Sequence, residues 1–119
     1  GNYILFFENG KAVRIPVKSY ETKLNRKKLS SAFYDGSPVV AIYPCGTAKE
    51  YLMLSNVRKA LLIKETQVVE KSTRSSMGAA VMTLKAGQKV ESVVPYDPDK
   101  NKLSKESKYR KYICPLLRF

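Results

Sequence analysis

The chain has 119 residues, 44% of them apolar and 27% charged, which suits one modest folded domain or two repeat units and excludes disorder along its whole length. Twenty-two Lys and Arg against ten Asp and Glu give a net charge of +12, so we expect a polyanionic partner, most often nucleic acid and next an anionic membrane surface, unless the charge serves solubility alone. No apolar run approaches the roughly 20 residues of a membrane span, and the absence of histidine and of any CxxC pair argues against a zinc site.

The first predicted element is a β-hairpin. Tyr3–Phe7 is a continuous apolar run of strand length. The Asn9-Gly10 pair that follows is the strongest short-range hairpin signal and indicates a type I′ turn, in which both residues have positive φ. Lys11–Pro16 is the predicted return strand, which ends at Pro16 because proline cannot donate a hydrogen bond to the ladder.

A polar segment and two further strands complete this first unit. Residues 19–31 are predicted to form an extended loop, and the strands are expected at Ala32–Tyr34 and Val39–Tyr43. Between them, the composition of residues 35–38, Asp-Gly-Ser-Pro, is typical of a turn. The polar loop carries four cations, which are Lys23, Arg26, Lys27 and Lys28.

The same pattern returns 48 residues later without a gap, and Tyr51–Ile63 is predicted to form a second hairpin. The identical positions are Tyr3, Lys11, Ala12, Ile15 and Lys23, which recur as Tyr51, Lys59, Ala60, Ile63 and Lys71. The apolar residues between them recur as other apolar residues, which favours duplication over chance. The second unit continues through a polar loop that contains Arg74 to predicted strands at Ala79–Leu84 and Val90–Val94.

A repeat of 40–50 residues built from short strands is typical of propeller blades. The predicted fold class is therefore all-β, with two propeller-like blades of about four strands each. We place the first blade at residues 1–48 and the second at 49–96. Residues 97–119 form a basic C-terminal tail, in which the apolar residues 112–117 are a candidate closing strand.

The sequence offers no catalytic constellation. Without histidine there is no imidazole base for a Ser-His-Asp or Cys-His arrangement. Neither a P-loop nor a GxGxxG motif occurs, and no pair of acidic residues has a spacing that argues for acid–base work. We expect this chain not to be catalytic by itself, and we expect neither a cofactor nor a metal.

What remains is a set of cations on loops between strands. Arg, Lys, small hydroxyl side chains and free backbone N–H groups are the usual contacts to nucleic-acid phosphates. The alternative is that these loops carry ordinary solvated charges. The aromatic residues fall mostly within predicted strands, so core packing is their expected role rather than stacking on single-stranded bases. The predicted DNA-binding residues are Arg26, Lys27, Lys28 and Arg74, supported by Lys23, Lys71, Arg58 and Lys59.

Tyr3–Pro16 resembles the opening of a blade in the C-terminal domain of the type IIA topoisomerase A subunit, the family of the DNA gyrase A protein and the topoisomerase IV ParC protein. Thr22–Leu29 resembles the loop in divergent members of that family. Tyr51–Tyr96 follows the same blade pattern. The resemblance implies a β-pinwheel, a disc of blades with exchanged strands that binds duplex DNA on its basic rim. It further implies two partners, a separate cleavage domain and an ATPase subunit. It also implies that the protein has no membrane partner and that it lies in the bacterial cytoplasm, associated with the nucleoid.

The sequence departs from that family at one motif. Gyrase carries a Gln-Arg-Arg-Gly-Gly-Lys-Gly box for wrapping DNA, and the nearest match here, Ser72–Gly78, keeps only an Arg and the final Gly. The departure from the box favours the topoisomerase IV-like member of the family, which bends DNA more weakly. Two blades cannot close a disc of five or six, so we expect a larger parent domain. The alternatives are a protein-interaction module and a binder of RNA or single strands.

Overall fold

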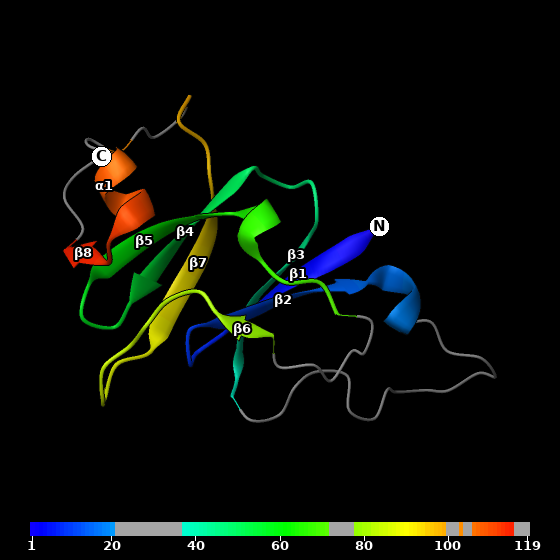
Figure 1. Cartoon of the computed structure of the whole chain (residues 1–119), viewed down its shortest axis with the longest axis horizontal. Coiled ribbons are helices and arrows are strands. Elements are labelled where there is room, and N and C mark those ends of the chain that lie inside the picture. Colours follow the sequence, from blue (N-terminus) through cyan, green and yellow to red (C-terminus); the bar gives the residue numbers. More distant parts are fainter. Residues whose placement is uncertain (21–36, 72–77, 100–102, 104–105, 116–119) are drawn as a thin grey trace.

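The computed structural model describes residues 1–20, 37–71, 78–99, 103 and 106–115, and it contains two antiparallel four-stranded sheets (Figure 1). The all-β prediction is therefore confirmed. The first sheet has the order β3 (Val39–Pro44), β1 (Asn2–Phe7), β2 (Lys11–Pro16), β6 (Ala79–Ala80). The second has the order β7 (Val90–Tyr96), β4 (Glu50–Ser55), β5 (Lys59–Lys64), β8 (Cys114–Pro115). The strand predicted at Ala32–Tyr34 lies outside the described residues.

The offset of 48 residues holds for the backbone as well as the sequence. Strands β1 and β4 begin and end at equivalent positions, and so do β2 and β5. The short 3-10 turns η1 (Val17–Tyr20) and η2 (Glu65–Gln67) also begin at equivalent positions. Even the register shift recurs, between Phe6 and Phe7 in the first sheet and between Leu54 and Ser55 in the second. The two sheets are thus copies of one unit.

Both predicted hairpins form, but the type I′ turn predicted at Asn9-Gly10 is wrong. Among the described residues, Arg58 is the one non-glycine residue with positive φ, so Asn9 does not have the conformation that a type I′ turn requires. The N–H of Gly10 donates to the carbonyl of Phe7, and only Gly10 is left-handed, with φ of 84°. This is the pattern of the common three-residue connection, in which a turn is followed by one left-handed residue.

The fourth strand of each sheet comes from elsewhere in the chain, which corrects the strand predicted at Ala79–Leu84. Only Ala79–Ala80 is a strand, and it pairs with β2 of the first sheet, not with the second sheet. Beyond it, the N–H groups of Val81 and Met82 both donate to the carbonyl of Gly10. At the equivalent edge of the second sheet, β8 pairs with β5. The sheets are therefore built by strand exchange, as the family resemblance implied.

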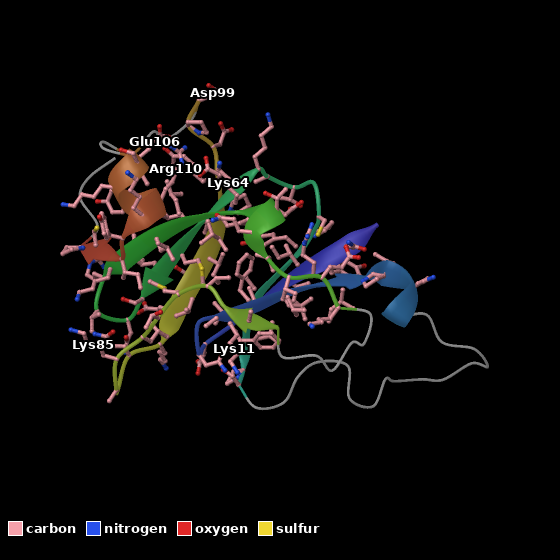
Figure 2. The ribbon with its side chains drawn as sticks, viewed as in Figure 1. Lys11, Lys64, Lys85, Asp99, Glu106 and Arg110 are labelled. Atoms are coloured by element: carbon pink, nitrogen blue, oxygen red, sulfur yellow. The ribbon has the colours of Figure 1, made fainter. Side chains whose placement is uncertain are left out.

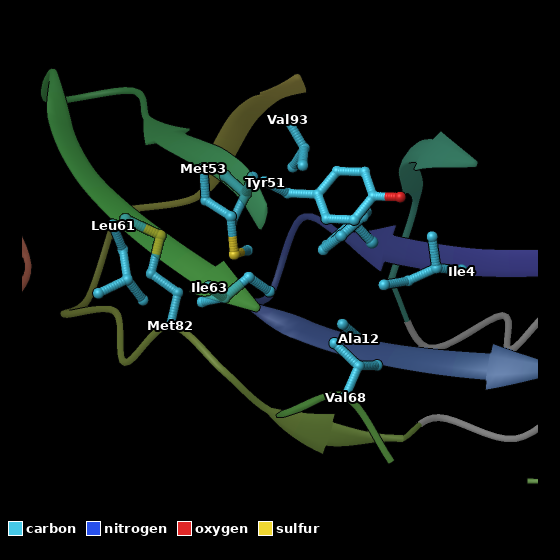
Figure 3. Close-up of a cluster of buried hydrophobic side chains, with 11 residues drawn as sticks. Ile4, Ala12, Tyr51, Met53, Leu61, Ile63, Val68, Met82 and Val93 are labelled. Carbon is cyan, nitrogen blue, oxygen red and sulfur yellow. The ribbon is translucent and has the colours of Figure 1, made fainter. Parts of the chain in front are cut away.

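The main core lies between the two sheets. Side chains from β1 and β2 meet side chains from β4 and β5, with Tyr51 near the middle of the cluster (Figure 3). Tyr51 is fully buried, and its hydroxyl donates to Glu65 at 2.8 Å. Burial and this hydrogen bond raise the pKa of Tyr51, so the phenol stays neutral. The other face of the first sheet forms a second buried cluster, which consists of Leu5, Phe7, Val13 and Ile15.

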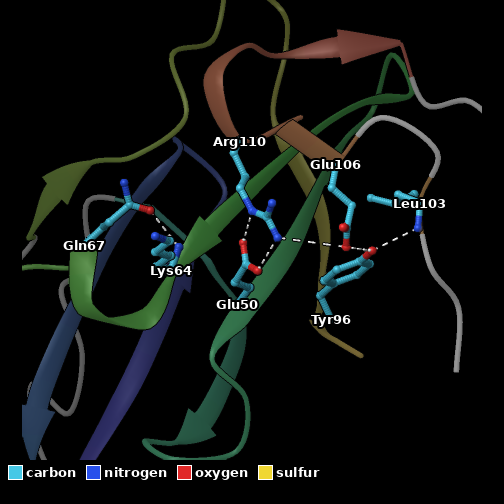
Figure 4. A network of polar contacts seen from close by, with 7 residues as sticks. All are labelled: Glu50, Lys64, Gln67, Tyr96, Leu103, Glu106 and Arg110. Carbon is cyan, nitrogen blue, oxygen red and sulfur yellow. Dashed lines mark hydrogen bonds and ion pairs between the residues drawn. The ribbon is translucent and has the colours of Figure 1, made fainter. Parts of the chain in front are cut away.

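The other face of the second sheet is covered by helix α1 (Glu106–Lys111), an element that the sequence did not predict. Tyr109 is 1% exposed and donates to the carbonyl of Pro115 in β8. Arg110 makes two hydrogen bonds of 2.7 Å to the carboxylate of Glu50 in β4 (Figure 4). These bonds hold the pKa of Glu50 below its usual value. The hydroxyl of Tyr96 donates to Glu106, which ties the start of the helix to β7.

Candidate nucleic-acid interface

The predicted DNA-binding residues divide into two groups. Lys71, Arg58 and Lys59 lie within the described residues. The remaining five lie outside them, and they are Lys23, Arg26, Lys27, Lys28 and Arg74.

Arg58 lies in the turn between β4 and β5, and Lys59 is the first residue of β5. Arg58 is exposed, and it occupies the left-handed position that Gly10 occupies in the first hairpin, with φ of 59°. The buried hydroxyl of Ser55 fixes this turn by accepting hydrogen bonds from the N–H groups of Val57 and Lys59 at 3.3 and 3.1 Å. The constrained turn and the start of β5 therefore place two consecutive cations, exposed Arg58 and half-buried Lys59, at one end of the second sheet.

A second turn, which precedes β7, packs against this one and adds two cations. The side chain of Asn56 donates to the carbonyl of Gly87 and accepts from the N–H of Lys89, at 3.3 and 3.1 Å. Lys85 is exposed on this second turn (Figure 2), and Lys89, just before β7, is exposed as well. The ammonium of Lys89 lies 3.8 Å from the carboxylate of Glu8, so part of its charge is compensated. The sequence carries no local signal that this second turn docks on the hairpin.

Lys71 does not belong to this group. Its N–H donates to the carbonyl of Arg14 at 2.9 Å, which places it beside β2 of the first sheet. Arg14 is itself held by a hydrogen bond from its Nε to the carbonyl of Val68. Of the three described candidates, the structure therefore brings together Arg58 and Lys59 and leaves Lys71 apart.

Gly78, the glycine that the partial match at Ser72–Gly78 keeps, serves the fold. Its φ is 70°, and a Cβ at this position would lie 2.1 Å from the carbonyl oxygen of Ala12. Glycine is needed at this position because the exchanged segment comes close to the backbone of β2 where it begins to pair with that strand.

Most of the described aromatic side chains are buried or partly buried in the core. Phe6, Phe7 and Tyr51 are fully buried, and Tyr43 donates its hydroxyl to the carbonyl of Val93. Tyr112 is the one strongly exposed aromatic in the described part of the chain, at 64%. The same part of the chain holds no cluster of metal ligands and no helix long and apolar enough to cross a membrane.

Arg58→Gly is expected to raise the free energy of unfolding by about 1 kcal/mol, because glycine adopts positive φ without steric cost and an Arg does not. If Arg58 also contacts DNA, the same variant binds duplex more weakly, so the two effects have opposite signs. Urea denaturation followed by circular dichroism measures the first, and fluorescence anisotropy of a labelled duplex measures the second. Arg58→Asn is the control, since asparagine tolerates the left-handed region but lacks the charge. A less stable Arg58→Gly would contradict the turn geometry.

No protein-family model and no curated protein matches the sequence. Among solved structures, the C-terminal domain of DNA topoisomerase IV aligns with a TM-score of 0.71 at 20% identity, over 82% of this chain and 30% of that chain. The DNA gyrase A C-terminal domain aligns with a TM-score of 0.63 at 23% identity, over 77% and 32%. This chain spans about a third of the length of the structures it matches. It has the blade fold of these two topoisomerase C-terminal domains.

Proposed function

We propose that this chain binds and bends duplex DNA without sequence specificity, as part of the C-terminal domain of a type IIA topoisomerase A subunit. The observation that carries the proposal is the blade fold shared with topoisomerase IV and gyrase A C-terminal domains, on a chain with a net charge of +12. A basic surface attracts the phosphate backbone, which carries no sequence information. The chain itself performs no chemistry, and it acts by holding DNA for the rest of the enzyme.

The proposed contacts are cations on loops and turns. Arg58, in the constrained turn, and Lys59, at the start of β5, supply two of them. Each engaged Lys or Arg releases condensed counterions from the duplex, so affinity falls steeply as salt rises. The other proposed contacts are Arg26, Lys27, Lys28, Arg74, Lys23 and Lys71. The proposed partners are duplex DNA, the other domains of the topoisomerase polypeptide and its ATPase subunit, in the bacterial cytoplasm at the nucleoid.

Burial of the aromatic residues supports duplex binding over single-strand binding. Single-strand binders stack bases on exposed aromatic rings, and the rings of Phe6, Phe7 and Tyr51 are fully buried in the core. A protein-interaction module remains the other alternative, and it predicts a duplex affinity no greater than that of an unrelated protein of equal charge.

A salt titration of binding tests the proposal. Affinity for a short linear duplex is expected to fall linearly on a log–log plot against salt, with a steep slope, and to equal or exceed affinity for the matching single strand. Neutralising Arg26, Lys27 and Lys28 together is expected to lower affinity and to reduce the slope by about three, one for each phosphate that is no longer neutralised. An unchanged slope would remove these three residues from the interface. Weak binding to both the duplex and the single strand would contradict the proposed function.

A further inference from the structure

We infer that α1 and β8, together called the end cap (residues 106–115), take the place of a following blade and close the second blade against strand exchange with another copy of this chain. The surface beneath the end cap fits a blade of a second copy, because the first blade offers the equivalent surface to the second blade. This inference goes beyond the proposed function and holds whether or not the chain binds DNA.

The end cap covers the face of the second sheet that corresponds to the packing face of the first. On the first sheet, the residues of this face that are buried in the core shared with the second blade are Ile4, Phe6 and Ala12. Their equivalents 48 positions later are Leu52, Leu54 and Ala60. These equivalents pack in the cluster that contains Tyr109 and Cys114 of the end cap. Figure 1 shows α1 beside β5, on the side of the second sheet away from the first.

The end cap also fills the pairing edge of the second sheet. Strand β6 pairs with β2 at Lys11 and Ala12, and β8 pairs with β5 at Lys59 and Ala60, which are the equivalent residues. The register of the added strand is therefore the same in both sheets, although β6 comes from the next blade and β8 comes from the end cap. An uncovered strand edge is a template for pairing with another chain, and the end cap removes that template.

The turn residue beside this edge differs between the two blades in a way that excludes an exchanged segment. In the first blade, the carbonyl of Gly10 accepts hydrogen bonds from the N–H groups of Val81 and Met82. A Cβ on Gly10 would lie 2.1 Å from the carbonyl oxygen of Met82. Arg58 occupies the equivalent position, also with positive φ, and has that Cβ. A segment that followed the same path along the second blade would collide with it.

The contacts that hold the end cap are separate from the core between the two sheets. Tyr109 is 1% exposed and anchors α1 on the second sheet, and Arg110 makes two hydrogen bonds to the carboxylate of Glu50. The thiol of Cys114 is buried beneath the end cap. Cys114 therefore reports whether the end cap is docked, provided that the half-buried Cys45 is first replaced by serine.

The first measurement is the rate at which a thiol reagent labels Cys114 in the whole chain carrying Cys45→Ser. Tyr109→Ala is expected to raise this rate at least about tenfold, because the end cap loses its anchor and opens locally. Tyr112→Ala is the matched control, since Tyr112 is 64% exposed, and it is expected to leave the rate unchanged. Circular dichroism establishes that the two sheets remain folded. If Tyr109→Ala unfolds them, Arg110→Glu, which places a second carboxylate against Glu50, opens the end cap instead.

The second measurement uses a labelled peptide with the sequence of residues 67–84, the segment that fills the equivalent edge of the first blade. The Cys45→Ser chain is expected not to bind it. Tyr109→Ala/Arg58→Gly is expected to bind it at least about tenfold more tightly than either single variant, because the edge is then both uncovered and free of the Arg58 Cβ. A peptide with Gly78→Ala is the control, and it is expected not to bind, since a Cβ at Gly78 would lie 2.1 Å from the carbonyl oxygen of Ala12 in the first blade.

Three results would overturn the inference. Peptide binding by the Cys45→Ser chain as tight as that by the double variant would show that the edge is already open. Rapid labelling of Cys114 in the double variant without peptide binding would show that the edge does not accept such a strand. Slow labelling of Cys114 in both Tyr109→Ala and Arg110→Glu would show that the end cap does not open separately from the second sheet.

Discussion

Tyr51→Ala is expected to lower the free energy of unfolding by about 4 kcal/mol, within the range for deleting a large aromatic side chain from a core. The ring of Tyr51 is fully buried between the two sheets (Figure 3). Its centroid lies 5.3 Å from that of Phe6 and 5.5 Å from that of Tyr43. Alanine would leave a cavity where the two sheets meet and remove both aromatic contacts. Urea denaturation followed by far-ultraviolet circular dichroism measures the loss.

Two matched variants separate the causes of this loss. Tyr51→Phe keeps the ring and removes only the hydroxyl that donates to Glu65, so it is expected to cost about 1 kcal/mol. Tyr3→Ala changes the equivalent position of the first unit, where the side chain is half-buried, and is expected to cost less than Tyr51→Ala. A loss for Tyr51→Ala no larger than that for Tyr3→Ala would contradict the central place of Tyr51 in the core.

The repeating part of the fold could be predicted because it depends on local sequence. The recurrence of Tyr3 and Lys11 as Tyr51 and Lys59 placed both hairpins, and the structure aligns them at the same offset. Strand exchange could not be read in the same way. Ala79–Ala80 carries no mark of its partner, because pairing with β2 is a long-range contact that local propensity does not encode.

The type I′ turn was predicted wrongly at Asn9-Gly10 because the loop is longer than that pair suggests. Asn9-Gly10 suggests a two-residue loop, but the loop has three residues, and its left-handed position is the third. The second hairpin has the same left-handed third position, although Arg58 occupies it instead of glycine or asparagine.

The candidate site could be predicted only in part. Arg58 and Lys59 were selected by their charge, and the structure places them at one end of the second sheet. Lys85 and Lys89 were missed because their proximity depends on hydrogen bonds to Asn56 across more than 30 residues. Helix α1 was missed as well, because a helix of six residues is too short for a clear apolar period.

Gly10→Ala is expected to lower the free energy of unfolding by about 3 kcal/mol. A Cβ on Gly10 would lie 2.1 Å from the carbonyl oxygen of Met82, so the exchanged segment would have to move. That movement would weaken the hydrogen bonds from Val81 and Met82 to the Gly10 carbonyl, each worth about 1 kcal/mol. The left-handed conformation adds about 1 kcal/mol for a residue with a side chain. Urea denaturation again gives the measurement.

Gly87→Ala is the matched control, because it measures only the free-energy cost of placing a residue with a side chain in the left-handed conformation. Gly87 has φ of 79°, close to the 84° of Gly10, but a Cβ there would meet nothing within 4 Å. We therefore expect a loss of about 1 kcal/mol for Gly87→Ala, and the excess for Gly10→Ala measures the contact with residue 82. Equal losses for the two variants would show that the first hairpin does not need the segment that crosses it. The exchanged segment would then contribute little to joining the two sheets, and their shared core would have to hold them together.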